Sequence, residues 1–345
     1  MNIEQKVLSE PAKIRRILII QVSRIGDTLL STPTIRAIAT HFPEAAITVL
    51  GHPKRVDILK NIPFIQQVGE ISKNSAFWLG RFSGKVYDLA FVFGHDEALI
   101  RYALRVSQHV VAMKQKNVAL NKKLLHAAPL PAPMSRHAVY MQYSLVEHLD
   151  IPMSAQSLAY VVSGDEQAWA HAELIKRELN NRFPLIGLQI ASFPTKGYRD
   201  WPVENFVELA NRITDAYPQA HFLIFGGELE RNKTLFLANS LGSNATHLAG
   251  SLSLRQTAAL MNCLSYYVGV DTGPTHIMGA LSKPMMAFYH PSSPSQFLKP
   301  LQHPALTAVD HPLAGQVGPE ASMAGLTVDS VWAQLESALA TLKAP

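Results

Sequence analysis

The chain has 345 residues, of which 48% are hydrophobic and 17% charged, so we expect two folded domains and exclude a generally disordered polypeptide. No run of about 18 apolar residues occurs, residues 1–13 lack the apolar core of a signal peptide, and the single cysteine, Cys263, excludes a disulfide framework or a cysteine-based zinc site. Residues 1–150 carry 19 Lys and Arg against 11 Asp and Glu, whereas residues 151–345 carry 12 against 15, which favours an anionic partner for the first half.

The first half alternates apolar runs of strand length with helical segments. Strands are predicted at 16–22, 47–50 and 88–93, and helices at 28–41 and 55–60. Pro33 suits either the first turn of a helix or a kink. Apolar strands of this kind are typical of a parallel sheet that helices cover on both faces.

The same alternation restarts after residue 180. Strands are predicted at 185–190, 221–225, 246–248, 266–270 and 285–289, and helices at 202–217, 229–241, 253–262, 274–281 and 329–342. Two such series predict an α/β protein with two doubly wound, Rossmann-like domains. We expect the first domain at 1–160, a linker helix at 161–182 and the second domain at 183–345.

Ligands of such sheets bind outside the carboxyl ends of the strands, and we expect the site in the cleft between the two domains. The first candidate segment is Ser23-Arg24-Ile25-Gly26-Asp27, which follows the first strand. Gly26 allows a tight turn, and Asp27 can act as a general base on a substrate hydroxyl. The alternative is that Asp27 caps a helix. The glycine spacing differs from GxGxxG and therefore predicts no dinucleotide site.

The second candidate is the segment DTGPTH, which lies between a predicted strand and a predicted helix. Thr272 and Gly273 place a hydroxyl and free N–H groups at a helix N-terminus, where the helix dipole also favours a phosphate. His276 lies in the first turn and can donate to a phosphate oxygen. The alternatives are a helix cap at Asp271 or Thr272 and a packed core imidazole at His276.

Two further strand-to-helix loops fit a nucleotide diphosphate. Before the Trp-Pro dipeptide, Lys196 and Arg199 can neutralise phosphates, and arginine can do so with two parallel hydrogen bonds. In the loop 226–230, glycines leave room for a base or a ribose, and Glu228 or Glu230 can accept hydrogen bonds from ribose hydroxyls. The alternatives are a solvated basic loop and acids favoured by a helix N-terminus.

The segment 290–294 (HPSSP) is a weaker candidate, because a turn rich in Pro and Ser explains it. The sequence has no HExxH, no other metal-ligand spacing of histidine and no Asp-x-Asp pair, so we expect no metal site. Three segments of the second half are thus predicted to bind a nucleotide diphosphate. With Asp27 opposite them, they predict group transfer from a nucleotide-activated donor.

The positive charge of the first half limits the classes of partner that we expect. Nucleic acid, a phosphorylated glycan and an anionic membrane face are the three classes that such a charge favours, and ordinary solvated lysines are the alternative. No zinc-finger or RNA-binding fingerprint occurs in this half, which argues against nucleic acid. The single cysteine fits a reducing cytoplasm.

Three segments carry a family resemblance: RILIIQVSRIGDTLLSTPTIRAI, the Trp-Pro before a helix, and VGVDTGPTHIMGALSKPMMAFYHPSSP. Through them, residues 15–300 resemble the ADP-heptose:lipopolysaccharide heptosyltransferases, inverting glycosyltransferases of family 9 with the GT-B fold. The resemblance implies two Rossmann-like domains facing a central cleft, and transfer of L-glycero-D-manno-heptose from ADP-heptose to the lipopolysaccharide inner core. The second heptosyltransferase is the most similar type. ADP-heptose is a substrate, and the resemblance implies no cofactor and no metal.

The resemblance also assigns roles to single residues. Asp27 takes the place of the catalytic base, Arg199 stands where lysine is usual, and either Glu228 or Glu230 matches the acid that holds the ribose. The other residues expected at the donor site are Thr195, Lys196, Leu252, Asp271, Thr272, Gly273, Pro274 and His276. The residues expected to meet the phosphates and Kdo carboxylates of the acceptor are Arg24, Gly26, Lys54, Arg55, Arg81 and Lys85.

The implied reaction is a single displacement, in which Asp27 removes a proton from an acceptor hydroxyl while Arg199 and Lys196 stabilise the departing ADP. The implied acceptor is Kdo-lipid A or a heptosylated core, the implied location is the cytoplasm, peripheral to the inner membrane, and no nucleic acid is involved. The last helix is expected to pack back on the first domain. The alternatives are another nucleotide-sugar enzyme of GT-B architecture, such as an epimerase or a different glycosyltransferase, and a non-catalytic sugar-nucleotide-binding module.

Overall fold

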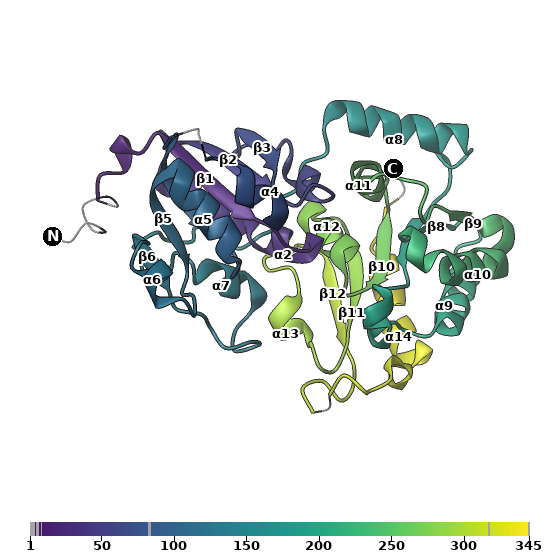
Figure 1. Ribbon diagram of the computed structural model, residues 1–345. Coiled ribbons are helices and arrows are strands. Elements are labelled where there is room, and N and C mark those ends of the chain that lie inside the picture. Colours follow the sequence, from purple (N-terminus) through teal and green to yellow (C-terminus); the bar gives the residue numbers. More distant parts are fainter. Residues whose placement is uncertain (1–3, 5–6, 8, 82–83, 317, 344–345) are drawn as a thin grey trace. The chain divides into compact units, whose positions relative to one another are not determined.

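The computed structural model describes the chain apart from residues 1–3, 5–6, 8, 82–83, 317 and 344–345. Part of the stretch in which we expected no signal peptide therefore lies outside the described residues. The chain divides into two compact units, Met1–Val161 and Val162–Pro345. Each unit holds a six-stranded parallel sheet with helices packed on it (Figure 1). Among the described residues, no helix is long and apolar enough to cross a membrane.

The sheet of the first unit has the strand order β3-β2-β1-β4-β5-β6. Its central strand β1 is the predicted apolar run, and the side chains at 17–20 are fully buried, as expected for a strand covered on both faces. The strands β3, β5 and β6 were not predicted, because they are short or mix polar with apolar residues. The strand bounds are β1 (Arg16–Gln21), β2 (Ala46–Gly51), β3 (Gln67–Glu70), β4 (Tyr87–Val92), β5 (Ser107–Met113) and β6 (His126–Ala128).

The helix expected at 28–41 is two helices that meet at Ser31. Pro33 lies in the first turn of the second one, where a missing N–H removes no helical hydrogen bond. Among the described residues of this unit, the helical segments η1, α4, α5, α6 and α7 were not predicted; the N-terminus of α5 is capped by the Asp96 side chain. The helical bounds are η1 (Pro11–Lys13), α2 (Ile25–Leu30), α3 (Thr32–His41), η2 (Val56–Leu59), α4 (Lys73–Trp78), α5 (Glu97–Val106), α6 (Val118–Asn121) and α7 (Ala138–Tyr143).

The sheet of the second unit has the order β12-β11-β10-β7-β8-β9. The predicted strands at 221–225, 266–270 and 285–289 are confirmed at both ends, since each is a continuous run that is fully buried. The edge strand β12 was not predicted. The bounds are β7 (Leu185–Gln189), β8 (His221–Phe225), β9 (Ala245–His247), β10 (Tyr266–Val270), β11 (Met285–Tyr289) and β12 (Leu306–Asp310).

The helices of the second unit follow the predicted order closely. Ser253 caps its helix as expected, through a reciprocal bond with Gln256. The linker helix expected at 161–182 spans only Gly164–Lys176. It packs on α11, with a two-bond ion pair between Glu166 and Arg255. The bounds are α8 (Gly164–Lys176), η3 (Pro194–Arg199), α9 (Val203–Ala216), η4 (Glu228–Glu230), α10 (Arg231–Leu241), η5 (Gly242–Asn244), α11 (Leu254–Asn262), α12 (Gly273–Leu281), α13 (Ser295–Leu298), η6 (Met323–Gly325) and α14 (Val328–Leu339).

The last helix, α14, was expected to pack back on the first domain. Its apolar face packs against α9 and β12 of its own unit. Val331, Leu335 and Leu339 are at most 1% exposed and belong to the core of this unit. Burying these three side chains stabilises the second sheet. That α14 also contacts the first domain stays a prediction.

Candidate active site

Each sheet has one point at which the strand order reverses. In the first unit the chain proceeds outward from β1 in one direction and from β4 in the other, and in the second unit β7 and β10 have the same relation. In doubly wound sheets, ligands bind outside the carboxyl ends of the strands at such points. The loops after β1 and β4, and those after β7 and β10, are therefore the places where functional side chains are expected.

Asp27 lies at the first of these points, in the opening turn of α2 directly after β1. The N-cap residue of α2 is Arg24, and Asp27 is the acidic residue of the first turn, a position that the helix dipole also favours. The backbone carbonyl of Asp27 accepts hydrogen bonds from the Ser31 N–H at 3.1 Å and the Gln21 side chain at 3.4 Å. Its carboxylate side chain is exposed, as a general base must be to reach a substrate.

The loop after β4 lies beside the Asp27 loop. The Phe93 N–H donates to the carbonyl of Ile20 at 2.9 Å, which continues the pairing of β1 with β4. Gly94 and His95, which follow, are exposed. Sequence reasoning passed over His95, although a polar residue directly after a buried strand was a signal that could have identified it.

The basic residues expected at the acceptor site fall into two groups. The Arg55 guanidinium donates to the carbonyl of Ser23 at 2.8 Å, which places it, and the preceding exposed Lys54, next to the Asp27 loop. Arg24 and Gly26 lie in that loop itself. This group is at the carboxyl edge of the first sheet.

Arg81 and Lys85 lie elsewhere. Both precede β4, and the Val86 N–H that follows donates to the carbonyl of Val106, directly before β5 begins. This position is at the amino edge of the sheet, opposite Asp27. The structure therefore does not bring Arg81 and Lys85 to the Asp27 loop, because the chain must return to the start of β4 before it re-enters the sheet.

The second switch point brings together the Trp-Pro loop and the DTGPTH segment. A guanidinium nitrogen of Arg199, after β7, lies 3.4 Å from a carboxylate oxygen of Asp271, after β10. The other oxygen of Asp271 lies 3.3 Å from Nε2 of His276. The Asp271 and His276 side chains are less than 10% exposed, whereas that of Arg199 is 24% exposed. Asp271 thus positions one cationic and one ionisable side chain at the start of α12.

Several buried polar atoms of this group have no hydrogen-bond partner within the described part of the chain. They are Nε of Arg199, Oδ1 of Asp271, Oγ1 of Thr272 and Nδ1 of His276. Buried polar atoms are usually paired, so four such atoms near one helix N-terminus indicate a place where a polar ligand binds. Thr272 is the N-cap of α12 but makes no capping bond, and Pro274 stands in the first turn. The N-terminal N–H groups and the dipole of α12 favour an anion here.

Tyr198, which the sequence reasoning did not select, organises the cations of the Trp-Pro loop. The Lys196 ammonium donates to its hydroxyl at 3.2 Å, and both Lys196 and Arg199 lie within 6 Å of the ring centroid. Partial burial opposes ionisation of Tyr198, but hydrogen bonds from the two cations outweigh burial and lower its pKa. The edge of the His290 ring packs on Tyr198 with centroids 5.0 Å apart.

Buried contacts of Trp201 and Asp200 fix the Trp-Pro loop on its own unit. Trp201 is fully buried, and its indole N–H donates to the carbonyl of Leu326 at 2.7 Å. Asp200 accepts a hydrogen bond from the Ser192 N–H and pairs with Lys233 at 2.8 Å. Thr195 lies between these anchors in η3. Such packing holds the neighbouring cations in one geometry, which a diphosphate site requires.

The structure distinguishes the two glutamates after β8. The Glu230 carboxylate accepts a hydrogen bond from the Gly227 N–H at 2.8 Å and so closes the turn. The Glu228 side chain is 69% exposed and lies over Gly250, where a Cβ atom would collide with its carboxylate. Gly250 also has φ +74°, which favours glycine. Glu228 therefore lies beside the loop that leads to Leu252 and forms an exposed ion pair with Arg231 at 3.6 Å, whereas the Glu230 carboxylate accepts the Gly227 N–H.

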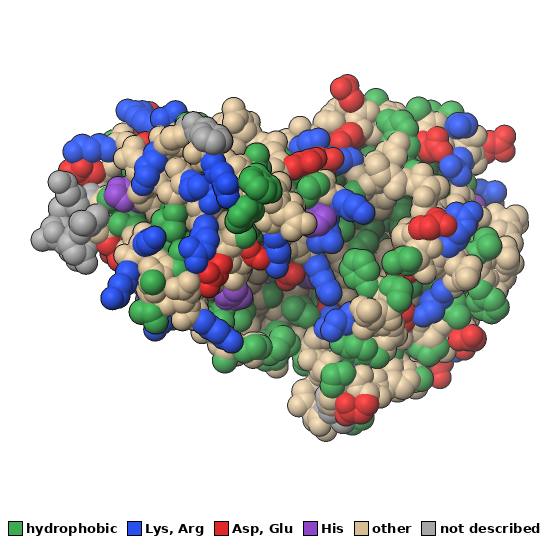
Figure 2. All heavy atoms as spheres, in the orientation of Figure 1, with side chains coloured by type: hydrophobic (Ala, Val, Ile, Leu, Met, Phe, Trp, Pro, Cys, Tyr) green, Lys and Arg blue, Asp and Glu red, His purple; other side chains and the backbone are tan. Residues whose placement is uncertain are grey.

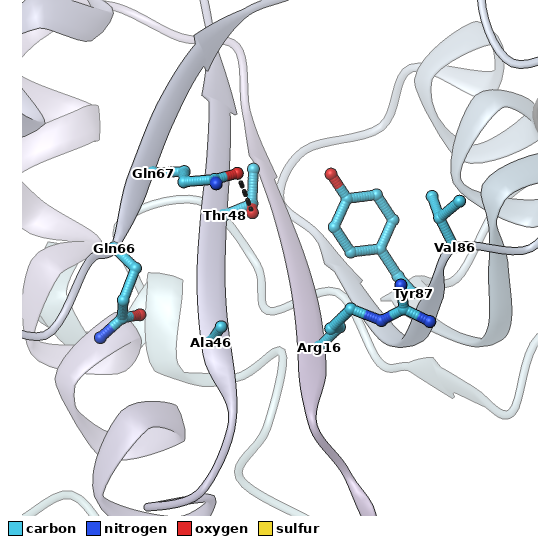
Figure 3. A pocket seen from close by; sticks show the side chains of 7 residues that line it. All are labelled: Arg16, Ala46, Thr48, Gln66, Gln67, Val86 and Tyr87. Carbon is cyan, nitrogen blue, oxygen red and sulfur yellow. Dashed lines mark hydrogen bonds between the residues drawn. The ribbon is translucent and has the colours of Figure 1, made fainter.

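A hollow of about 220 Å³ opens elsewhere on the first unit (Figure 3). Arg16, Ala46 and Tyr87 line it, and they are the first residues of β1, β2 and β4. It therefore lies at the amino edge of the sheet, away from Asp27. Within the described ranges, no group of three or more His, Cys, Asp or Glu side chains is arranged to hold a metal ion.

The fold and the two switch-point sites define a class: a GT-B protein, in which two Rossmann-like units are joined in one chain. Residues 99–312 match the sequence profile of glycosyltransferase family 9 (heptosyltransferase). This match spans more than half of the chain, and the protein belongs to that family.

Individual relatives are distant but cover nearly the whole chain. Lipopolysaccharide heptosyltransferase 2 of Salmonella typhimurium is 25% identical over 310 residues, which are 84% of this chain and 86% of that protein. The crystal structure of the family 9 glycosyltransferase from Veillonella parvula has a TM-score of 0.82 at 19% identity and covers 94% of this chain and 97% of that one. The heptosyltransferase WaaC of E. coli, solved with ADP, has a TM-score of 0.69 at 17% identity, covering 94% and 99%.

Proposed function

We propose that this protein transfers L-glycero-D-manno-heptose from ADP-heptose to the inner core of lipopolysaccharide, with inversion at the anomeric carbon. The observation that carries the proposal is the group Arg199, Thr272 and His276 at the N-terminus of α12, whose unpartnered nitrogen and hydroxyl atoms can donate to a diphosphate. The Salmonella relative is named as a heptosyltransferase of lipopolysaccharide, and the E. coli structure was solved with ADP. Both names agree with the ligand that this chemistry favours.

In this proposal the second unit holds the donor. Arg199 and Lys196 neutralise the diphosphate. The Thr272 hydroxyl and the N–H groups of Gly273 and Thr275 donate to its oxygens. The Nδ1 atom of His276 adds a further donor when it carries the proton. Glu228 accepts hydrogen bonds from the ribose hydroxyls, since Glu230 is occupied by the Gly227 N–H.

The reaction is a single displacement. The Asp27 carboxylate takes the proton of an acceptor hydroxyl, and the hydroxyl oxygen forms a bond to the anomeric carbon of the heptose. The bond from that carbon to the diphosphate oxygen breaks, and its electron pair leaves with ADP. The positive charge that faces the departing diphosphate comes from Arg199, Lys196 and the helix N-terminus, which stabilise the transition state most when they are already in place.

The acceptor would be Kdo-lipid A or a heptosylated core, held by the cations beside the Asp27 loop. Arg55 and Lys54 lie there, and they suit the phosphates and carboxylates of such a glycan. We place the protein at the cytoplasmic face of the inner membrane, peripheral to the bilayer. The similarity to heptosyltransferase 2 favours addition of the second heptose.

The decisive experiment incubates the protein with ADP-heptose and lipopolysaccharides truncated at defined core lengths, and reads the products by mass spectrometry. We expect a mass increase of one heptose on the acceptor that already carries one heptose, with release of ADP. Transfer only to an acceptor that ends in Kdo would contradict the second-heptose assignment. Conversion of the sugar nucleotide without any acceptor would instead indicate an epimerase.

Asp27 is tested in the same assay. We expect Asp27→Ala and Asp27→Asn to lower turnover by about 10²–10⁴, the usual contribution of a positioned base, while ADP affinity is retained. The control is Glu44→Gln, which alters an exposed carboxylate of the same unit that pairs with Arg15 at 2.9 Å and should transfer heptose at the unmodified rate. Undiminished turnover by the Asp27 variants would remove Asp27 from the mechanism.

A further inference from the structure

The end of α4 displays an aromatic pair to solvent. Phe77 is 55% exposed and Trp78 68%, and Leu79 beside them is 44% exposed. The two rings meet edge to face with centroids 5.0 Å apart. The Arg81 guanidinium lies 4.6 Å from the Phe77 centroid and 4.7 Å from that of Trp78. We call these four residues the aromatic-basic surface.

This surface is held in place from behind. The Arg105 side chain of α5 donates to the carbonyl oxygens of Ala76 and Leu79, which closes the C-terminus of α4. Gly80 follows with φ +73°, and a Cβ atom there would collide with Val106. The contact between α4 and α5 is therefore close, and the aromatic pair points outward from a fixed support.

The surroundings of the aromatic-basic surface are positive. From residue 71 to residue 87 the sequence contains three Lys and Arg residues and no Asp or Glu. Lys85 is exposed, and burial together with the charge of Arg81 lowers the pKa of Arg105. Figure 2 shows apolar side chains gathered over α4, with Lys and Arg side chains beside them.

Of these cations, Lys73 pairs with Asp96 at 2.7 Å, and Arg81 and Lys85 supply the remaining positive charge. Aromatic rings combined with positive charge suit one environment in particular. Trp favours the boundary between water and hydrocarbon, because its ring is apolar and its N–H is polar. Phe beside it adds apolar surface of the kind that interfacial helices bury among lipids. Arginine and lysine extend their charged ends to the lipid headgroups while their stems stay apolar. Anionic headgroups attract such cations over about a Debye length.

We propose that the aromatic-basic surface docks this protein on an anionic lipid bilayer, with Phe77 and Trp78 entering the headgroup layer and Arg81 pairing with lipid phosphates. The inference rests on the proposed function in one respect: a lipid-linked acceptor lies in a bilayer, and the unit that carries Asp27 is the unit that carries this surface. It also gives a role to Arg81 and Lys85, which lie away from the Asp27 loop.

The test is co-sedimentation of the full chain with vesicles of phosphatidylcholine, with and without about 30% phosphatidylglycerol. We expect binding to the anionic vesicles that weakens as salt is raised, because salt screens headgroup charge. Phe77→Ala/Trp78→Ala should lower the partition coefficient at least tenfold, and Arg81→Glu should lower it on anionic vesicles more than on neutral ones. The matched control is Ile175→Ala, which removes an apolar side chain of 62% exposure on α8 and should bind like the unmodified chain.

A second readout separates this proposal from the proposed function. Heptose transfer to a deacylated, water-soluble acceptor should be equal in the unmodified chain and in Phe77→Ala/Trp78→Ala, which also reports that the variant is folded. Failure of that transfer in both proteins, with vesicle binding intact, would refute the heptosyltransferase assignment and leave the docking surface standing. The docking proposal is overturned if the unmodified chain does not bind anionic vesicles, or if Phe77→Ala/Trp78→Ala binds them as well as the unmodified chain does. It is also overturned if this double variant loses self-association but keeps its vesicle binding.

Discussion

Arg199 is the side chain whose removal tests the donor site most directly. Its guanidinium lies 3.4 Å from Asp271 and is 24% exposed, while the Asp271 side chain is only 7% exposed. The variant Arg199→Ala has two effects on a bound diphosphate. It removes the cation that can donate two parallel hydrogen bonds, and it leaves a nearly buried carboxylate close to the negative ligand.

The size of the first effect follows from the type of bond. A hydrogen bond to a charged group contributes about 1.5–3 kcal/mol, and about 1.4 kcal/mol corresponds to a tenfold change in affinity. We therefore expect Arg199→Ala to weaken ADP binding by roughly 10- to 150-fold. The ADP affinity of Arg199→Lys should lie between those of the unmodified chain and Arg199→Ala, because lysine retains the charge but lacks the planar guanidinium.

The second effect is measured by a double-mutant cycle with Asp271→Asn, using isothermal titration calorimetry with ADP. If the uncovered carboxylate repels the diphosphate, Arg199→Ala/Asp271→Asn should bind ADP several-fold more tightly than Arg199→Ala alone. Arg212→Ala is the control, since this arginine pairs with Glu208 and Asp329 on the surface of the same unit; its ADP affinity should be unchanged. An Arg199→Ala variant that binds ADP within threefold of the unmodified chain would refute the assigned role of Arg199.

Two further predictions concern side chains of the second unit. Glu228→Gln should weaken ADP binding, measured by calorimetry, with little change in the thermal unfolding midpoint. Glu230→Gln should lower that midpoint, because it disturbs the bond to the Gly227 N–H; the reverse pattern would contradict our assignment of the two glutamates. Burial and, to a lesser degree, Arg182 lower the pKa of His221 to about 4. Since the unfolded chain then binds more protons between pH 6.5 and pH 4, the free energy of unfolding should fall as the pH drops through that window, by at most about 3 kcal/mol from this residue. Urea titrations at pH 7 and pH 5 measure this change. The free energy of unfolding of His221→Gln should fall less between the two pH values than that of the unmodified chain, and an equal fall in both proteins would exclude His221 as a source of acid sensitivity.

The strands of the second unit were predictable because each is a continuous apolar run between polar turns. The segments 266–270 and 285–289 are fully buried on both faces, so their composition alone separates them from their surroundings. In the first unit, β3 carries the polar sequence QVGE and is only half-buried. Local composition did not distinguish it from a loop, and its pairing with β2 is what makes it a strand.

The roles of single residues divide in the same way. That Glu228 and Glu230 both suit a ribose was visible in the sequence, but the hydrogen bond from the Gly227 N–H to Glu230 is a property of the folded turn. Tyr198 gave no motif signal, because its importance comes from the two cations that converge on its ring and hydroxyl.

The sequence by itself determined the fold class, the two strand–helix series and the loops that carry the chemistry, since each depends on local periodicity and on residue types next to a strand end. The tertiary structure decided which of those loops meet. Arg199 reaches Asp271 across 72 positions of the chain because β7 and β10 are neighbours, and Arg81 and Lys85 fall on the opposite edge from Asp27 because the chain returns to the start of β4. Strand order is a contact between distant segments, and no local pattern specifies it.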